Sequence, residues 1–139
     1  MRSYLIVANR TLSGAHLLEE VKARSAAEEC RFHVVVPATP DGGHTNWTEG
    51  AAHAQAQQRL DAALAQFHAA GIEMTGEVGD ESPVRAVGDA LIREQFDAII
   101  LSTLPPGASR WLKRDLPHRL ARRYPVPVIH VIGKPELVS

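Results

Sequence analysis

Two apolar runs of the chain are each followed immediately by polar side chains that could bind a ligand. Asn9 and Arg10 come after the first run, and Ser102 and Thr103 come after a later one. Amide, guanidinium and hydroxyl groups form hydrogen bonds to hydroxyls and to anions. The chemistry that these residue types favour is therefore the binding of a polar or anionic molecule.

A further stretch, Gly-Ala-Ser-Arg at residues 107–110, has the composition of a small anion site. Backbone N–H groups beside Gly107, the Ser109 hydroxyl and the Arg110 guanidinium can all donate hydrogen bonds to one anion. Trp111 and Leu112 follow at once. We interpret these two as core or interface residues rather than as groups that stack on a nucleotide base.

Catalytic and metal-site patterns are absent from the sequence. No pair of the seven histidines has the close spacing of zinc ligands, and Ser13 and Ser109 lack the setting of an activated nucleophile. Cys30 is the only cysteine, and nothing near it in the sequence would lower its pKa. We predict a protein that is not an enzyme and holds no metal. His44, in a polar loop at residues 39–46 whose role stays open, is the histidine best placed to titrate beside a site.

The length and charge of the chain set the domain count and exclude some partners. Its 139 residues suit one domain, residues 1–139, whose core needs no disulfide or metal. Fifteen basic and sixteen acidic residues give a formal net charge of −1, which offers no overall field for nucleic acid. No signal segment and no membrane-spanning apolar run are present. We expect a cytoplasmic protein that binds neither nucleic acid nor membrane.

One local concentration of basic residues departs from this even balance. It comprises Arg110, Lys113, Arg114, Arg119, Arg122 and Arg123. Such clusters are more often a solvated helix face than a phosphate site, and we adopt that interpretation.

The elements that must position these residues alternate along the chain. Five strands are predicted: largely apolar runs indicate those at residues 4–8, 32–36, 97–101 and 128–132, and a weak alternation of apolar and polar residues indicates the one at residues 72–78. Helical spacing of apolar residues predicts helices over residues 13–29, within residues 47–70, from Ser82 and Pro83 onward, and after Asp115. Thr11 or Ser13 could cap the first helix, and Gly71 is placed to end the second.

This alternation predicts an α/β, Rossmann-like fold: an open five-stranded parallel sheet with helices on both faces. In such sheets ligands bind outside the carboxyl ends of the strands, where the strand order reverses. Residues 9–14, 37–47 and 102–115 occupy those ends, so the binding residues singled out above are expected to meet there.

Three segments of the sequence together resemble the universal stress proteins. They are V-G-D-E-S-P-V-R-A-V at residues 78–87, F-D-A-I-I-L-S at residues 96–102 and V-P-V-I-H-V at residues 126–131. The resemblance spans nearly the whole chain and implies the strand order 3-2-1-4-5. It also implies a nucleotide site that includes Asn9, Arg10 and Val36. A homodimer through the last strand is implied as well, with Val128, His130, Val131 and Ile132 at the interface.

The phosphate-binding motif of that family is replaced in this chain. ATP-binding members carry, after the fourth strand, a glycine, two residues, a second glycine, nine residues, and then a glycine with serine or threonine. Ser102, Pro105 and Asp115 stand at the glycine positions here, and Leu116 stands at the hydroxyl position. Pro105 has no N–H to donate. A carboxylate about 5 Å from a phosphate charge would cost on the order of 3 kcal/mol, or roughly a hundredfold in affinity.

Two functions follow from these observations. The leading one is a non-enzymatic stress-response module that acts as a homodimer without a cofactor, its nucleotide pocket lost or altered. In it, Asp115 caps the last helix and supplies the site with its own anion. The alternative is a sensor, or a weak hydrolase, that binds ATP, another nucleotide or an anionic metabolite. That reading uses Arg10, Ser102, Thr103, Ser109 and Arg110.

Overall fold

The computed structural model describes residues 1–39 and 49–133, without the side chains of Glu49 and Arg110. The polar loop predicted at residues 39–46 lies, apart from Thr39, outside the described residues. His44 therefore also lies outside them, and so does the side-chain role predicted for Arg110.

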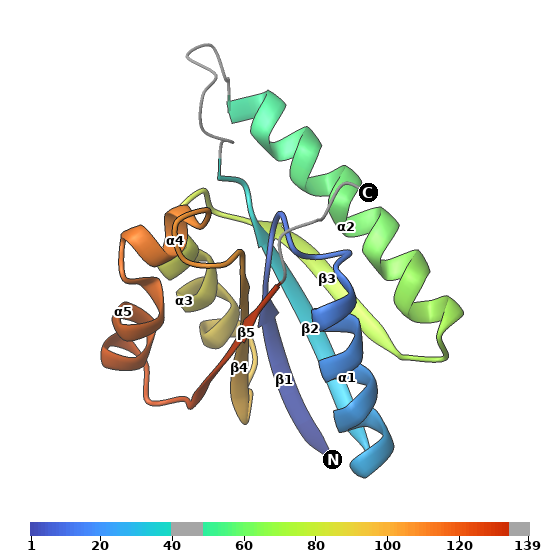
Figure 1. Ribbon diagram of the computed structural model, residues 1–139. Coiled ribbons are helices and arrows are strands. Elements are labelled where there is room, and N and C mark those ends of the chain that lie inside the picture. Colours follow the sequence, from blue (N-terminus) through green and yellow to red (C-terminus); the bar gives the residue numbers. More distant parts are fainter. Residues whose placement is uncertain (40–48, 134–139) are drawn as a thin grey trace.

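Five parallel strands form one sheet (Figure 1). They are β1 (Arg2–Val7), β2 (Cys30–Pro37), β3 (Met74–Gly79), β4 (Ala98–Thr103) and β5 (Val128–Ile132). Their order in the sheet is β3-β2-β1-β4-β5. The predicted fold class and strand order are confirmed, and each predicted strand end lies within two residues of the observed one.

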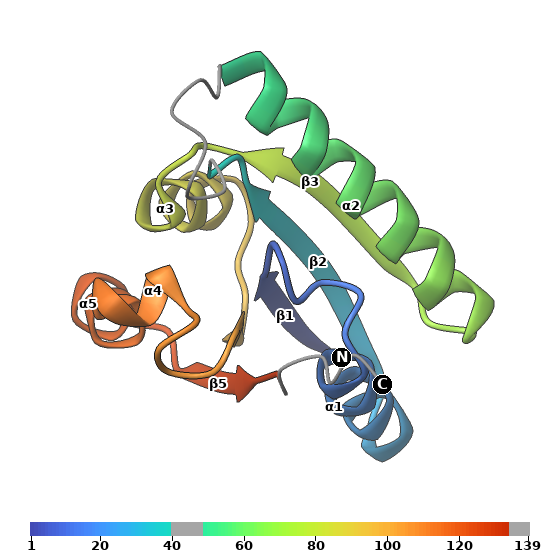
Figure 2. The same cartoon turned by 45° about the horizontal axis from the view of Figure 1, so that its top comes forward.

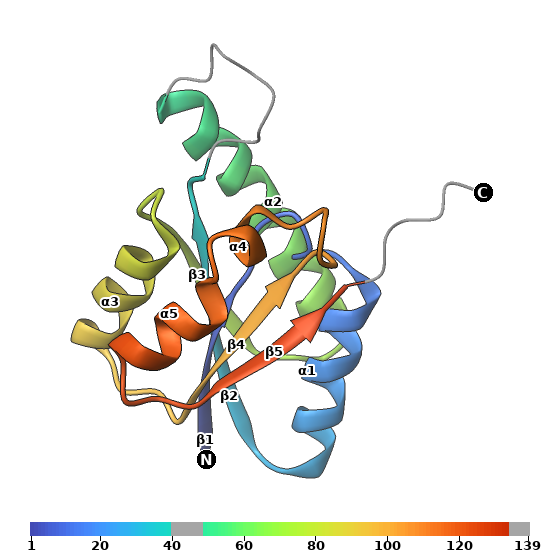
Figure 3. The ribbon, with the colours of Figure 1, turned by 60° about the vertical axis from the view of Figure 1, so that its left-hand side comes forward.

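Helices cover both faces of the sheet, as predicted. They are α1 (Ala15–Ala27), α2 (Glu49–Ala69), α3 (Pro83–Arg93), α4 (Arg110–Lys113) and α5 (Leu116–Arg123). α1 and α2 lie on one side of the sheet, and α3, α4 and α5 lie on the other (Figure 3). The long helix α2 runs alongside β3 (Figure 2). The short helix α4 is an element that the sequence pattern did not predict.

The core consists of two apolar layers, one on each face of the sheet. In β1, Tyr4 and Ile6 point to the layer formed with α1 and α2, while Leu5 and Val7 point to the layer formed with α3 and α5. Side chains of a strand alternate between the two faces, so a strand covered on both sides must be apolar at successive positions. This is why the predicted central strands are continuous apolar runs.

Most of the helix ends follow local sequence rules. Gly71 ends α2 with a φ of 80°, a conformation that glycine adopts without steric cost. The Ser82 hydroxyl accepts a hydrogen bond from the Arg85 N–H at 3.5 Å at the start of α3. The cap predicted for α1 is wrong. Gly14 precedes α1 and no side chain caps it, so neither Thr11 nor Ser13 has that role.

Candidate functional site

Four buried polar residues gather where β1 and β4, neighbouring strands of the sheet, end. They are Asn9, Thr11, Ser102 and Thr103, and each is less than a tenth exposed. Because carboxyl ends of parallel strands meet at one edge, residues about 90 positions apart in the sequence come together here. We call these four residues the strand-end cluster. Asn9, Ser102 and Thr103 had been predicted as binding residues, whereas Thr11 had been considered only as a cap.

Asn9 is held by two protein partners. Its side-chain amide donates to the Pro37 carbonyl at the end of β2 at 2.8 Å. Its side-chain oxygen accepts a hydrogen bond from the Arg59 guanidinium on α2. Asn9 therefore links β1, β2 and α2, and both ends of its amide group are occupied by the protein.

Thr11 and Ser102 form a buried hydroxyl pair, with 2.6 Å between their oxygens. Ser102 stands at the first position where the resemblance expects a glycine. Its side chain occupies the space beside the end of β1 and bonds there to another side chain. A hydroxyl so engaged offers less to a ligand than the bare backbone of glycine would.

Thr103 is hydrogen-bonded to His130 of β5, with 2.7 Å between the hydroxyl oxygen and Nε2. Burial lowers the pKa of His130, because the charged imidazolium is the form that burial disfavours. The neutral ring is therefore favoured at pH 7, and it brings no positive charge to this edge of the sheet. His130 had been predicted only as an interface residue, and its contact with Thr103 was missed.

The loop after β4 uses several of its polar groups within itself. The backbone N–H groups of Ala108 and Ser109 both donate to the Pro105 carbonyl at 3.1 Å. The Ser109 hydroxyl accepts from the Leu112 N–H at 3.2 Å, at the start of α4. Gly107 has a φ of 90°. Ser109 thus supports the short helix α4, and its N–H is committed to a turn rather than presented to an anion.

Asp115 stands before α5 in the left-handed conformation, with φ 56° and ψ 41°. It occupies the N-cap position, but its side chain makes no capping hydrogen bond, so the predicted capping role is wrong. Its carboxylate instead lies 2.8 Å from Nδ1 of His118, and the two side chains are 55% and 76% exposed. A left-handed backbone suits glycine best, and Asp115 stands at the third glycine position of the motif.

The remaining predicted site residues lie in different surroundings. Val36 is fully buried in the layer beneath α1 and α2, where it packs as a core residue. Arg10 is exposed at the end of β1. Leu116, at the motif's hydroxyl position, is the first residue of α5, and its side chain is buried in the apolar layer between the sheet and helices α3 and α5. Sequence reasoning missed Arg59, because a contact made across fifty residues leaves no local signal.

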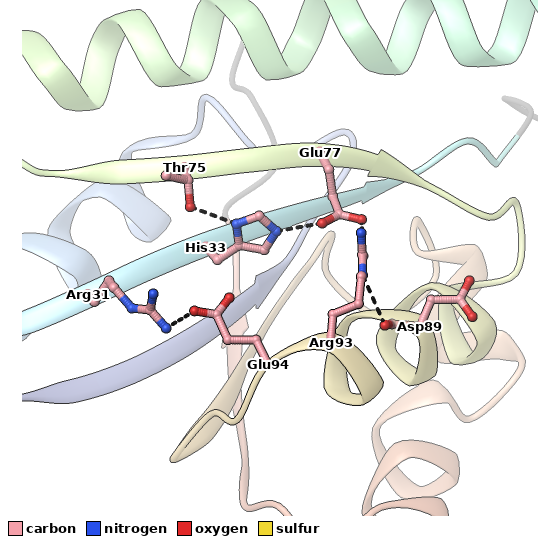
Figure 4. A network of polar contacts seen from close by, with 7 residues as sticks. All are labelled: Arg31, His33, Thr75, Glu77, Asp89, Arg93 and Glu94. Carbon is pink, nitrogen blue, oxygen red and sulfur yellow. Dashed lines mark hydrogen bonds and ion pairs between the residues drawn. The ribbon is translucent and has the colours of Figure 1, made fainter.

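A second polar network lies between β2, β3 and α3, and it shares no residue with the strand-end cluster (Figure 4). His33 bonds to Thr75 through Nδ1 and to Glu77 through Nε2, both at 2.7 Å. Glu77 also pairs with Arg93 of α3. Arg31 pairs with Glu94, just past the end of α3. These contacts attach the carboxyl end of α3 to the sheet, which is a structural role.

This network makes stability depend on acidity. Burial would raise the pKa of Glu77, but hydrogen bonds from Arg93 and His33 outweigh it and lower that pKa below 4.5. A carboxylate whose pKa is lower in the folded protein than in the unfolded chain stabilises the fold at pH values above its unfolded pKa. This contribution is lost as the pH falls through the folded pKa.

We expect Glu77→Gln to reduce the free energy of unfolding at pH 7 by less than about 1 kcal/mol, since solvent screens the network. Urea denaturation at pH 7, 5, 4 and 3 measures the difference between wild type and variant. That difference should shrink below pH 4.5. A difference that stays constant down to pH 3 would contradict the assignment to Glu77.

The possible metal ligands and the single thiol of the described residues have the following settings. No group of three or more possible metal ligands occurs among those residues. Burial raises the pKa of the Cys30 thiol, and its sulfur contacts the backbone carbonyls of Arg24 and Glu28 at 3.4 and 3.3 Å. A thiol with a raised pKa is a poor nucleophile. No helix in residues 1–39 and 49–133 has the length and apolarity to cross a bilayer.

Comparison with known proteins supports the fold. No protein-family model and no curated protein matches the chain. A universal stress protein from Archaeoglobus fulgidus matches in structure with a TM-score of 0.63, 15% identity and coverage of 94% of this chain and 93% of that one. A universal stress protein in complex with cAMP matches with a TM-score of 0.60, 21% identity and coverage of 95% and 97%.

A third solved structure agrees with these two. It is a universal stress protein family protein from Arabidopsis thaliana with AMP bound, with a TM-score of 0.63, 10% identity and coverage of 96% of this chain and 92% of that one. At identities of 10 to 21% it is the path of the backbone that is shared, over nearly the full length of each chain. Strand order, layers and these matches agree: this chain has the universal stress protein fold.

Proposed function

We propose that this chain is a non-enzymatic, cytoplasmic stress-response module that acts as a homodimer and whose nucleotide pocket is altered. One observation carries the proposal. The polar side chains at the ends of β1 and β4 are hydrogen-bonded to the protein itself, through Thr11 to Ser102, Thr103 to His130, and Asn9 to Pro37 and Arg59.

A nucleotide needs hydrogen-bonding groups at this edge that are not already bonded to the protein. Its ribose and phosphates bind to free donors, above all to backbone N–H groups at a glycine-rich turn. Here Pro105 lacks an N–H, and its carbonyl already accepts two of the loop N–H groups. Binding a nucleotide would mean breaking buried hydrogen bonds, each of which costs about 1–3 kcal/mol when a partner is left unsatisfied.

The proposed dimer uses β5. This strand lies at an edge of the sheet, and Ile132 is 43% exposed. An apolar edge strand with unpaired backbone groups favours pairing with another chain. We propose that Val128, His130, Val131 and Ile132 contact the same strand of a second copy, because a two-fold dimer pairs identical surfaces.

Two observations support the alternative, a sensor for a nucleotide or another anionic metabolite. Two of the structures that share this fold are complexes with cAMP and with AMP. In addition, Asp115 keeps the left-handed backbone that a glycine would adopt at its position. In this second proposal the loop retains the path of a phosphate-binding turn, and exposed Arg10 supplies positive charge.

Titration calorimetry with ATP and with AMP, in the presence of magnesium, separates the two proposals. With an altered pocket we expect no measurable heat and no rise in melting temperature, which corresponds to a Kd above about 1 mM. Binding in the micromolar range would overturn the leading proposal and place the sensor first.

Removing the charge of Asp115 should improve binding of AMP. We expect Asp115→Gly and Asp115→Asn to strengthen it about tenfold, because one repulsive charge is gone. The effect is smaller than the hundredfold estimated above for a carboxylate about 5 Å from a phosphate, since this side chain is 55% exposed and solvent screens its charge. Asn tolerates the left-handed backbone, so the two variants separate the effect of charge from that of backbone strain.

The readout for these variants is the shift in melting temperature at millimolar AMP. Asp61→Asn, on the exposed face of α2, is the matched control and should leave that shift unchanged. If both Asp115 variants respond to AMP as the wild type does, repulsion by Asp115 is not what weakens the site.

A further inference from the structure

Positive charge is concentrated in one short part of this protein. Residues 110–123, which contain α4 and α5, hold six of the fifteen basic residues and one of the sixteen acidic ones. That segment therefore has a formal charge of +5, while the rest of the chain has −6. An even overall balance thus conceals a strong local asymmetry, which is a sign of an electrostatic partner.

The basic side chains of residues 113–123 are exposed and close together along the chain. We call Lys113, Arg114, Arg119, Arg122 and Arg123 the α5 basic surface, and all five are exposed. α5 turns Leu116 and Leu120 into the core, whereas Arg119 and Arg122, three positions apart on the same helix, are exposed. The helix itself lies on the side of the sheet opposite α1 and α2 (Figure 3). None of the five makes an ion pair within the described residues. Asp115, the acidic residue of this segment, is paired with His118.

These five cations make no ion pair among the described residues, so they repel each other where they lie close together. α5 has eight residues and is about 12 Å long, so neighbouring charges lie within a Debye length of roughly 8–10 Å. An anionic occupant relieves this repulsion. The arginines favour a carboxylate-bearing or phosphate-bearing one, because the guanidinium fork binds both in a bidentate manner.

The rest of the molecule decides between carboxylate and phosphate partners. A nucleic acid strand is charged along its whole length and would extend from this short surface over the acidic remainder of the protein. Anionic bilayers favour basic surfaces that also carry apolar residues for insertion. The large exposed apolar residues of the described chain are Met1, Ile92 and Ile132, so α4 and α5 present none. A short acidic segment avoids both difficulties.

We propose that the α5 basic surface is the docking site for an acidic segment of a partner protein, rich in Glu or Asp. The surface lies across the sheet from α1 and α2, and it does not depend on whether the strand-end cluster binds a nucleotide. In this assignment Arg119 and Arg122 form the centre of the contact, with Lys113, Arg114 and Arg123 around them.

Fluorescence anisotropy tests the proposal with a labelled peptide of ten glutamates as the probe. We expect the full chain to bind this peptide at low salt and to lose affinity as salt rises. Arg119→Glu/Arg122→Glu should weaken binding by at least about tenfold. Lys22→Glu places the same change of charge on an exposed position of α1 and should alter affinity by less than about twofold.

Two competing probes complete the test. A labelled single-stranded DNA of ten nucleotides, and vesicles of phosphatidylserine and phosphatidylcholine, should bind more weakly than the peptide. If the protein bound the DNA or the vesicles more tightly than the peptide, the assignment would be overturned. An equal loss of peptide affinity in Lys22→Glu and in the double variant would overturn it as well. Should Arg119→Glu/Arg122→Glu fail to fold, Arg119→Gln/Arg122→Gln removes the charges without adding new ones. It should still weaken peptide binding, and unchanged affinity in it would overturn the proposal.

Discussion

Replacing Ile132 with aspartate is expected to convert the proposed dimer into monomers. Ile132 ends the edge strand β5 and is 43% exposed, so the change adds a charge at the proposed interface with little effect on the core. Burying an unpaired charge in an interface costs about 3 kcal/mol or more, which weakens association at least a hundredfold. Val131 is a less suitable position, because it also packs against the core beneath α1 and α2.

Sedimentation velocity at several protein concentrations measures this effect. Ile92→Asp is the matched control, because Ile92 is 85% exposed on α3 and lies outside the proposed interface. Wild type and control should sediment as dimers, and the Ile132 variant as a monomer with an unchanged melting temperature at low concentration. If the wild type is monomeric, or the Ile132 variant remains dimeric, β5 is not the interface.

Replacing Ser102 with alanine is expected to lower the free energy of unfolding by about 1–3 kcal/mol. The Ser102 hydroxyl is the partner of Thr11 at 2.6 Å in a buried setting, and its removal leaves the Thr11 hydroxyl without that bond. Thr11→Val should cost a similar amount for the converse reason. The double variant Thr11→Val/Ser102→Ala should cost clearly less than the sum of the two, since both polar groups are then gone.

Urea denaturation of the four proteins in this cycle measures the coupling. Ser25→Ala, an exposed serine in α1, is the matched control and should change stability by less than about 0.5 kcal/mol. Strictly additive effects would mean that Thr11 and Ser102 do not depend on each other. The view that the strand-end cluster is saturated by its own hydrogen bonds would then lose its main support.

Alternation of apolar runs and helical stripes was sufficient to predict an open parallel sheet with helices on both faces, whereas the strand order was implied by the resemblance to the universal stress proteins. Continuous apolar runs such as residues 98–101 indicate strands that are covered on both faces, and parallel strands need helical crossovers of one hand. These rules are local or topological, so no side-chain contact had to be known. Helix ends were less predictable: Ser82 and Gly71 act as expected, while Thr11 bonds across the sheet to Ser102 instead of capping α1.

The contacts within the candidate site could not be predicted in this way. The positions of Asn9, Ser102 and Thr103 at the sheet edge followed from the sequence, but their hydrogen-bonding state did not. Their partners Arg59, Thr11 and His130 come from other elements. Asp115 is a similar case: the capping role inferred from its type gives way to a contact with His118 and a left-handed backbone.

The amino-acid sequence by itself determined the order of elements, the parallel sheet and the edge at which polar residues gather, because these follow from hydrophobic periodicity and chain topology. Only the tertiary structure decided which of those polar residues remain open to a ligand. That outcome depends on hydrogen bonds of 2.6 to 2.8 Å whose two partners lie up to 91 positions apart in the sequence. It also decided that the five basic residues of residues 113–123 are exposed, while Leu116 and Leu120 of α5 are buried in the core.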